Sequence, residues 1–128
     1  MGREFRPNTI VVVEDEEDIR ALAATLFEEA DLKVREFERA DAAWTHIEKN
    51  PEQIAILFTD VNTPGSMDGL TLGQRVSQRF PWIRVIVTSG KALPSEAAGD
   101  VTFLPKPWLP LDLLMAAEDG RPRDARHA

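Results

Sequence analysis

The chain has 128 residues, of which 43% are hydrophobic and 29% charged, a composition typical of one globular domain. It has no cysteine, which excludes disulfides and thiolate chemistry, and no apolar run near the roughly 20 residues that a membrane span needs. The net charge of -7 argues against broad nucleic-acid binding, because phosphates repel acidic surfaces. We therefore expect a cytoplasmic domain with no direct contact to nucleic acid or membrane.

Short apolar runs alternate with helix-like stretches in the first half of the chain. Residues 9–13 form a continuous β-branched run, which predicts a strand buried on both faces. The apolar spacing of residues 17–30 predicts a helix, and the alternation of apolar and charged residues over 32–37 predicts an edge strand. Residues 41–49 predict a second helix, which Pro51 ends. The stripe expected to face inward on the first helix is Ile19, Leu22, Ala23, Leu26 and Ala30.

The second half continues this alternation. Residues 55–60 predict a third buried strand, which ends in an aspartate, and residues 85–90 predict a fourth. Between them, residues 70–79 predict a helix that Pro81 stops. The side chains expected to face inward on this helix are Leu72, Val76 and Phe80.

The last predicted elements are shorter. Residues 91–98 leave room for about two helical turns at most, because Pro94 interrupts the segment and Gly99 closes it. Residues 101–104 predict a fifth strand, and the segment from residue 109 or 110 to 118 predicts a last helix. The side chains expected on one face of that helix are Leu111, Leu114 and Met115.

Five strands that alternate with five helices predict a three-layer α/β/α fold around a mostly parallel sheet. We expect one domain over residues 9–118, a leader over residues 1–8 and a flexible tail over residues 119–128. Parallel strands end at the same edge of a sheet, which is where open α/β sheets bind their ligands. The polar side chains that follow four of the strands are Glu14 and Asp15, then Asp60, then Thr88 and Ser89, and finally Lys106.

Asp60 is the centre of the predicted site. Taken alone, an aspartate after a strand is as consistent with a turn or helix cap as with a function. Two further carboxylates, a hydroxyl group and a lysine at the same edge indicate a functional site. Neighbouring carboxylates repel one another unless a cation neutralises them, and their oxygen atoms suit Mg²⁺ or Mn²⁺. With the metal and Lys106 balancing charge, Asp60 could attack a phosphoryl group and form an acyl phosphate.

The motifs at these strand ends stand in a characteristic order. They are Glu14-Asp15, Asp60 within Phe-Thr-Asp-Val-Asn-Thr-Pro, Met67-Asp68-Gly69, Thr88-Ser89-Gly90, Phe103 and Lys106-Pro107. Over roughly residues 9–118, the chain resembles a response-regulator receiver domain, the phosphoacceptor module of two-component signalling, of the kind found in chemotaxis regulators. The resemblance implies a flavodoxin-like, doubly wound sheet of five parallel strands in the order 2-1-3-4-5.

The resemblance also implies roles for the residues at the strand ends. Asp60 is implied to be phosphorylated, and Lys106 is implied to contact the phosphoryl group. Asp15 is implied to bind Mg²⁺ directly and Glu14 through water. The implied metal ligands also include Asp60 and the main-chain carbonyl of Asn62.

Two further residues fall at the switch positions of the family. Ser89 takes the position of the switch hydroxyl, and Phe103 takes that of the switch aromatic. Core packing is an equal alternative for Phe103 and the favoured interpretation for Thr88. On phosphorylation, Ser89 is expected to swing toward the phosphoryl group and Phe103 to fill the space it leaves, as a population shift. Pro107 is implied to follow a cis peptide bond.

Three features depart from the usual family pattern. Glu14 replaces the more usual aspartate, which lengthens the side chain. Residues 63–69 make the loop after Asp60 one residue longer than its commonest form. Only thirteen positions lie between Ser89 and Phe103, so we expect helix four to be shortened or remodelled.

The resemblance implies a sensor histidine kinase or a histidine phosphotransfer protein as the phosphodonor and an unknown downstream protein as the target, with a phosphorylation-dependent dimer as a possible output. The chain is not expected to be an enzyme, beyond Mg²⁺-dependent self-phosphorylation from a phosphodonor and slow autodephosphorylation. The donor is expected to dock on the first helix and on residues 105–108. In that loop, Trp108 is either an exposed contact or a core residue.

Three other classes of protein fit less well. A pseudo-receiver, which keeps the fold as an interaction module without phosphorylation, would not need the full set of acid, hydroxyl and lysine. An aspartate-nucleophile phosphatase would need a carboxylate where Asn62 stands. A nucleotide- or flavin-binding sheet needs a first loop that holds phosphate, but residues 14–17 are all acidic.

Overall fold

The sheet consists of five parallel strands in the order β2-β1-β3-β4-β5, which confirms the predicted topology. The computed structural model describes residues 7–91 and 101–119. Nearly all of the segment predicted as a shortened helix four, of the leader and of the tail lies outside these residues. The strands are β1 (Thr9–Val13), β2 (Lys33–Phe37), β3 (Ile54–Asp60), β4 (Arg84–Ser89) and β5 (Val101–Pro105).

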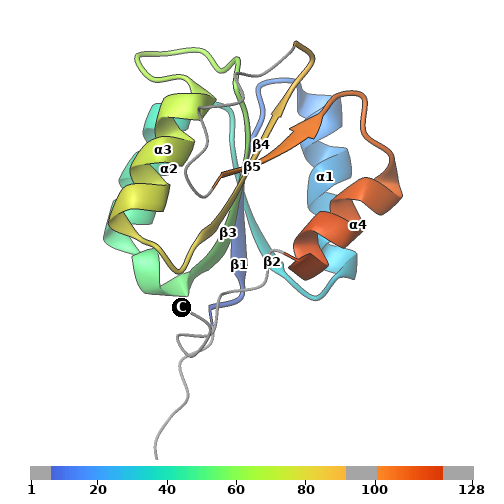
Figure 1. Cartoon of the computed structure of the whole chain (residues 1–128), viewed down its shortest axis with the longest axis horizontal. Coiled ribbons are helices and arrows are strands. Elements are labelled where there is room, and N and C mark those ends of the chain that lie inside the picture. The colour runs from blue at the N-terminus through green and yellow to red at the C-terminus, as the bar shows by residue number, and fades with distance from the viewer. Residues whose placement is uncertain (1–6, 92–100, 120–128) are drawn as a thin grey trace, which may run out of the picture.

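Four α-helices in the described part of the chain cover the two faces of this sheet (Figure 1). Helices α2 (Ala40–Lys49) and α3 (Gly69–Arg79) lie on one face. Helices α1 (Glu17–Glu29) and α4 (Pro110–Asp119) lie side by side on the other. The predicted last helix is therefore α4, and the three-layer arrangement is as expected.

Each face of the sheet has its own apolar core, because successive side chains of a strand point to opposite faces. All residues of β3 are buried, as expected for a central strand covered by helices on both sides. The core on the α2 and α3 side includes Val11, Val13, Ile47, Leu57, Leu72 and Val76. The core on the α1 and α4 side includes Ile10, Val12, Phe27, Phe58, Ile86 and Leu113.

The register of the strands brings their C-terminal ends to one level. Val13 pairs with Thr59, and Asp60 pairs with Thr88. Ser89 in turn pairs with the last residue of β5. The polar residues that end or follow β1, β3, β4 and β5 therefore lie along a single edge, as the alternating pattern predicted.

The predicted inner face of the first helix is wrong at Leu22, whose side chain is 46% exposed. The buried residues of α1 are Ala23, Ala24, Leu26 and Phe27. Phe27 occupies the core position instead, where its ring packs edge-on against Phe58. The helix is turned so that its one large aromatic side chain reaches the sheet, and an aromatic ring buries more apolar area than a leucine.

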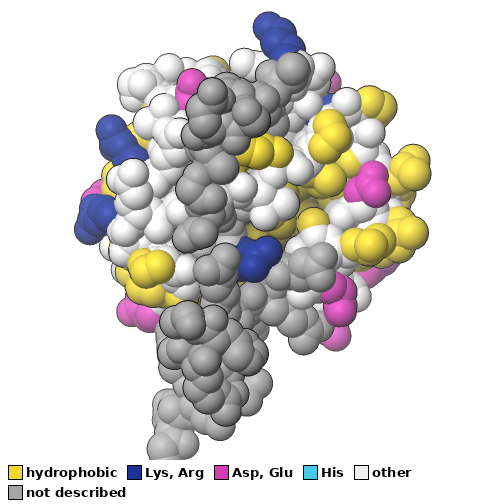
Figure 2. All heavy atoms as spheres, viewed as in Figure 1, with side chains coloured by type: hydrophobic (Ala, Val, Ile, Leu, Met, Phe, Trp, Pro, Cys, Tyr) yellow, Lys and Arg dark blue, Asp and Glu magenta, His cyan; other side chains and the backbone are white. Residues whose placement is uncertain are grey.

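Most of the apolar face predicted for the last helix points outward. Leu111 and Met115 are 62% and 56% exposed, whereas Leu113 and Ala117 are buried against the sheet and α1. Helix α4 carries apolar residues on all of its sides, so their spacing alone does not decide which side faces inward. Figure 2 shows the resulting hydrophobic side chains on the outer surface of the α4 side of the molecule.

Candidate functional site

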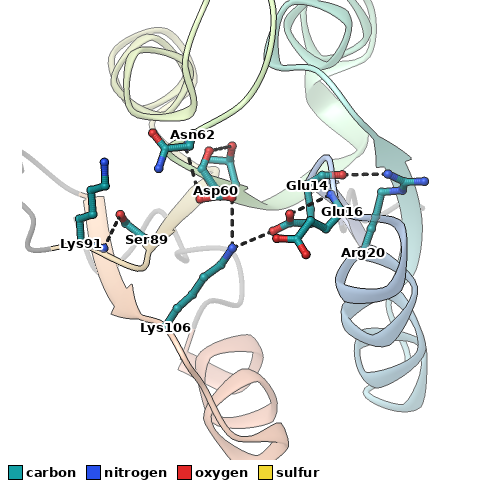
Figure 3. A network of polar contacts seen from close by, with 9 residues as sticks. Glu14, Glu16, Arg20, Asp60, Asn62, Ser89, Lys91 and Lys106 are labelled. Carbon is teal, nitrogen blue, oxygen red and sulfur yellow. Dashed lines mark hydrogen bonds and ion pairs between the residues drawn. The ribbon is translucent and has the colours of Figure 1, made fainter.

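Lys106 is the centre of a polar network at the C-terminal edge of the sheet (Figure 3). Its Nζ atom donates hydrogen bonds to Glu14 Oε1 and to Asp60 Oδ2, both at 3.1 Å. Asp60 is the last residue of β3, Glu14 follows β1 and Lys106 follows β5. The ammonium group thus joins two carboxylates delivered by different strands, and the structure brings these three predicted residues together.

Burial governs the electrostatics of this network. It raises the pKa of the Glu14 carboxyl, although the Glu16 N–H and Lys106 act in the opposite direction. Burial alone would lower the pKa of Lys106, but its hydrogen bonds to Glu14 and Asp60 outweigh that effect, and the pKa is raised. Lys106 therefore keeps its charge at neutral pH. Since buried carboxylates are costly without a partner, the lysine serves the fold as well as the site.

The main chain fixes the two buried carboxylates from the other side. The N–H of Asn62 donates to Asp60 Oδ1 at 3.3 Å, and the N–H of Glu16 donates to Glu14 Oε2 at 3.0 Å. Each carboxylate therefore accepts one backbone hydrogen bond and one from Lys106. Such charge-assisted bonds hold the two groups in one orientation before any ligand binds.

Three carboxylates at this edge could hold a metal ion. Oxygen atoms of Glu14, Asp15 and Asp60 lie within 4.8 Å of one another, with Asp15 exposed and the other two buried. An all-oxygen set with one solvent-facing member suits a hard divalent cation that keeps some of its water, as Mg²⁺ does. The side chains therefore fit the metal predicted from the sequence.

Ser89 lies at the same edge but outside the Lys106 network. Its side chain is buried, and its Oγ atom accepts a hydrogen bond from the Lys91 N–H at 3.1 Å (Figure 3). Its main-chain carbonyl accepts from the Lys106 N–H at 2.9 Å. Phe103 of β5 is half-buried and packs against the core on the α2 and α3 side, while Thr88 is fully buried. Thr88 thus packs in the interior as predicted.

The match to a protein family covers most of the chain. Residues 10–118 match the model of the response regulator receiver domain. The chain belongs to this family.

Relatives of this receiver domain support the assignment. The response regulator receiver protein CpdR of Brucella abortus (strain 2308) is 28% identical over 114 residues, which cover 85% of this chain and 92% of CpdR. The crystal structure of the receiver domain of NtrX from Brucella abortus has 30% sequence identity and a TM-score of 0.74, and the match covers 87% of this chain and 96% of that domain.

The match to the full NtrX chain covers only a part of that longer protein. In the crystal structure of Brucella abortus NtrX in complex with ADP, the matched region is 30% identical with a TM-score of 0.74. It covers 89% of this chain but only 27% of the NtrX chain. Separately, no helix in the described residues is both long and apolar enough to cross a lipid bilayer.

The loop after β5 agrees with the receiver pattern at one position and decides between the two interpretations of Trp108. The Lys106–Pro107 peptide bond is cis, as the resemblance implied. Trp108 is half-buried and packs against the core on the α1 and α4 side, with its ring 6.1 Å from that of Phe58 in an edge-on arrangement. Of the two alternatives for Trp108, core packing is therefore the correct one.

Arg20 is a site residue that sequence reasoning missed. Its Nη1 atom donates to the Glu14 carbonyl at 2.9 Å (Figure 3). Its Nε atom pairs with Glu36 Oε1 at 3.4 Å. The side chain is only 16% exposed. A signal was available, because a cation in the first turns of a helix is disfavoured by the helix dipole and needs a reason to be there.

Gly69 allows helix α3 to begin directly against the end of β3. A Cβ atom at this position would lie 1.7 Å from the Asp60 carbonyl oxygen, which no side chain can tolerate. The Gly69 N–H donates to the Val61 carbonyl at 2.9 Å. The sequence showed this glycine only as part of a motif, whereas the structure shows that close backbone approach requires it.

The loop after Asp60 is hydrogen-bonded to the start of helix α2. Ser66 donates to Asp41 Oδ2 from its Oγ atom at 3.3 Å and from its N–H at 3.5 Å. Arg39 forms a fork of hydrogen bonds to the same carboxylate, at 2.9 and 3.1 Å. Gly65 passes over this pair with a φ of +105°. The loop thus forms a turn that packs on a surface ion pair.

Proposed function

We propose that this receiver domain accepts a phosphoryl group on Asp60 from a phosphohistidine of a sensor histidine kinase or a histidine phosphotransfer protein. The observation that carries this proposal is the bridge from Lys106 Nζ to Glu14 Oε1 and Asp60 Oδ2, both at 3.1 Å. A buried carboxylate held next to a charged lysine, with Asp15 beside it, is suited to receive a highly anionic group.

The proposed reaction is a direct phosphoryl transfer. A carboxylate oxygen of Asp60 forms a bond to phosphorus as the phosphorus–nitrogen bond of the donor breaks, and the bonding electron pair returns to the imidazole nitrogen. Lys106, already charged, stabilises a phosphoryl oxygen. Glu14, Asp15, Asp60 and the Asn62 carbonyl would hold Mg²⁺ or Mn²⁺, which supplies charge neutralisation of the phosphoryl oxygens.

In the proposed reaction, the protein modifies only its own Asp60 and turns over no separate substrate. Its Asp60 takes the phosphoryl group from a small phosphodonor in the presence of Mg²⁺ and loses it slowly to water, so the protein is a phosphoprotein switch and no enzyme in the ordinary sense. Ser89 then exchanges its bond with the Lys91 N–H for one to the phosphoryl group, and Phe103 moves into the space that is freed.

Two surfaces are proposed for partners of this cytoplasmic domain. The donor protein docks on α1, where Leu22 is 46% exposed, and on the loop of residues 105–108, next to Leu109, which is 68% exposed. A downstream protein, or a second phosphorylated copy, recognises the surface that Ser89 and Phe103 alter. Neither nucleic acid nor membrane is a proposed partner of the acidic chain.

The experiment is the Asp60→Asn substitution, followed by intact-mass measurement with a small acyl phosphate as donor. The wild-type chain should gain one phosphoryl mass in the presence of Mg²⁺, and the variant none. Asp18→Asn, at an exposed position in the first turn of α1, is the matched control and should behave as wild type. Equal labelling of Asp60→Asn and wild type would overturn the assignment. A wild-type chain that takes no phosphoryl group and binds no Mg²⁺ would indicate a pseudo-receiver instead.

A further inference from the structure

Arg20 connects three elements next to the carboxylates of the site. It belongs to α1, donates to the carbonyl of Glu14 at the end of β1 and pairs with Glu36 of the edge strand β2. Its side chain is 16% exposed, whereas that of Glu36 is 45% exposed. The bond to the Glu14 carbonyl is therefore the better shielded of the two contacts, at the better hydrogen-bond distance of 2.9 Å.

The position of Arg20 has a cost that its contacts must offset. It is the fourth residue of α1, a helix whose first turn is acidic, and the positive end of the helix dipole disfavours a cation there. Partial burial of the guanidinium adds a desolvation cost. The contact that gives this arginine a structural purpose is the Glu14 carbonyl, because Glu36 offers only a solvent-exposed pair at 3.4 Å.

The Arg20 bond completes the fixation of Glu14. The N–H of this residue donates to the Phe37 carbonyl at 3.0 Å, and its carbonyl accepts from Arg20. Both polar groups of its main chain are therefore held. The carbonyl belongs to the peptide plane between Glu14 and Asp15, so its orientation sets the direction in which the exposed Asp15 leaves the strand.

We infer that Arg20 is a positioning residue for the divalent-metal site. It fixes the peptide between Glu14 and Asp15, and so keeps both carboxylates within 4.8 Å of Asp60. This inference rests on the proposed function only in requiring that these carboxylates bind Mg²⁺. Loss of an outer partner of this kind weakens metal binding by about tenfold. The rate of phosphorylation at saturating Mg²⁺ should change little, because Arg20 contacts neither Asp60 nor Lys106 in the described structure.

A purely electrostatic role for Arg20 predicts the opposite sign. A positive charge close to the acidic pair competes with Mg²⁺, so removal of the charge alone would tighten metal binding. Positioning predicts weaker binding for Arg20→Met. It also predicts weaker binding for Arg20→Lys, because the lysine nitrogen takes the place of the guanidinium carbon and falls one bond short of the Nη1 atom that reaches the Glu14 carbonyl. The two variants therefore separate geometry from charge.

The test measures Mg²⁺ affinity by titration calorimetry, with no phosphodonor present. Arg20→Met and Arg20→Lys should both bind Mg²⁺ more weakly, the former by about tenfold. Glu36→Gln removes the exposed ion pair but leaves the carbonyl bond, so it is the matched control and should bind as wild type. Thermal melting in the absence of metal establishes that each variant is folded, and Arg20→Lys remains informative if Arg20→Met does not fold.

The possible outcomes separate this inference from the proposed function. Unchanged or tighter Mg²⁺ binding by both Arg20 variants would overturn the inference, as would equal weakening by Glu36→Gln. A wild-type chain that binds no Mg²⁺ would overturn it together with the metal part of the proposed function. If Arg20→Met weakens Mg²⁺ binding while the wild type takes no phosphoryl group, the inference stands and the proposed phosphorylation fails.

Discussion

The C-terminal edge of the sheet has two halves that differ in how far they are assembled. In one half, Glu14, Asp60 and Lys106 are joined by hydrogen bonds of 3.1 Å. In the other half, the hydroxyl of Ser89 is bonded to the Lys91 N–H, and Phe103 packs against the core. The charged groups proposed to perform the chemistry are thus already in place. Ser89 and Phe103, which are proposed to move in response to it, have other contacts.

The difference follows from the cost of burial. Two buried carboxylates without a counter-charge are unfavourable, so burial of Glu14 and Asp60 favours the assembled arrangement with Lys106 before any ligand binds. A neutral hydroxyl bonded to a backbone N–H gives up only about 1 kcal/mol when it changes partner. A site of this kind can hold its charges rigidly and still move its hydroxyl, which is what a switch requires.

Lys106→Ala should break the assembled half and have a larger effect than substitution of Ser89 or of Asp41. It leaves Glu14 and Asp60 facing each other without the ammonium group and removes a donor to the phosphoryl oxygens. We expect the rate of phosphorylation at saturating Mg²⁺ to fall by about 100-fold. Intact mass against time, with a small acyl phosphate as donor, measures this rate. A rate close to that of the wild type would show that the lysine is not part of the chemistry.

Ser89→Ala should act on the other half and have a smaller effect. The phosphoryl group still forms on Asp60, but it lacks one hydrogen bond, so the rate should fall by about tenfold or less. The change in chemical shifts of β5 on phosphorylation should largely disappear, because the variant has no hydroxyl whose movement could be coupled to Phe103. Nuclear magnetic resonance of the labelled chain, with and without phosphodonor, measures this response.

A neighbouring hydroxyl provides the control for Ser89. Thr88 is fully buried, and its Oγ1 atom has no hydrogen-bond partner in the part of the chain that the structure describes. Thr88→Val should therefore leave both the rate and the response of β5 unchanged. If Thr88→Val abolished the response and Ser89→Ala did not, the switch hydroxyl would be Thr88, and the division of the edge drawn here would need to be revised.

The sequence was sufficient to predict the strand ends and the residues that meet there. Apolar runs mark buried strands, and a parallel sheet must bring the residues after them, such as Asp60 and Lys106, to one edge. It was not sufficient for the outward face of α4, where Leu111 and Leu113 are alike in polarity and only packing against α1 selects between them. The partner of Arg20 could not be predicted because it is a main-chain carbonyl; the sequence marks only the unusual place of a cation near the start of a helix.

Asp41→Ala changes a residue outside the C-terminal edge of the sheet. It tests whether the loop after Asp60 depends on the ion pair of Asp41, and it should have the smallest effect. Asp41 holds the loop after Asp60 through Ser66, and the hydrogen bonds from Arg39 keep the pKa of its carboxyl below the ordinary value of 3.8. Because the ion pair is exposed, we expect the melting temperature to fall by about 2 °C or less at neutral pH. Hydrogen exchange of the Ser66 amide, which donates to this carboxylate, should become faster.

The pH dependence of this effect has a definite sign. A carboxyl whose pKa is lowered in the folded state stabilises the fold above its unfolded pKa and loses that contribution as the pH falls through the folded value. The difference in melting temperature between wild type and Asp41→Ala should therefore be present at neutral pH and shrink below about pH 4. Glu48→Gln removes another exposed pair, with Arg79 at 2.8 Å, and is the control that should leave Ser66 exchange unchanged. If the Ser66 amide exchanged equally fast in Asp41→Ala and in wild type, the loop would be held by its own turn. The network of Glu14, Asp60 and Lys106 would then not depend on the Arg39–Asp41 ion pair.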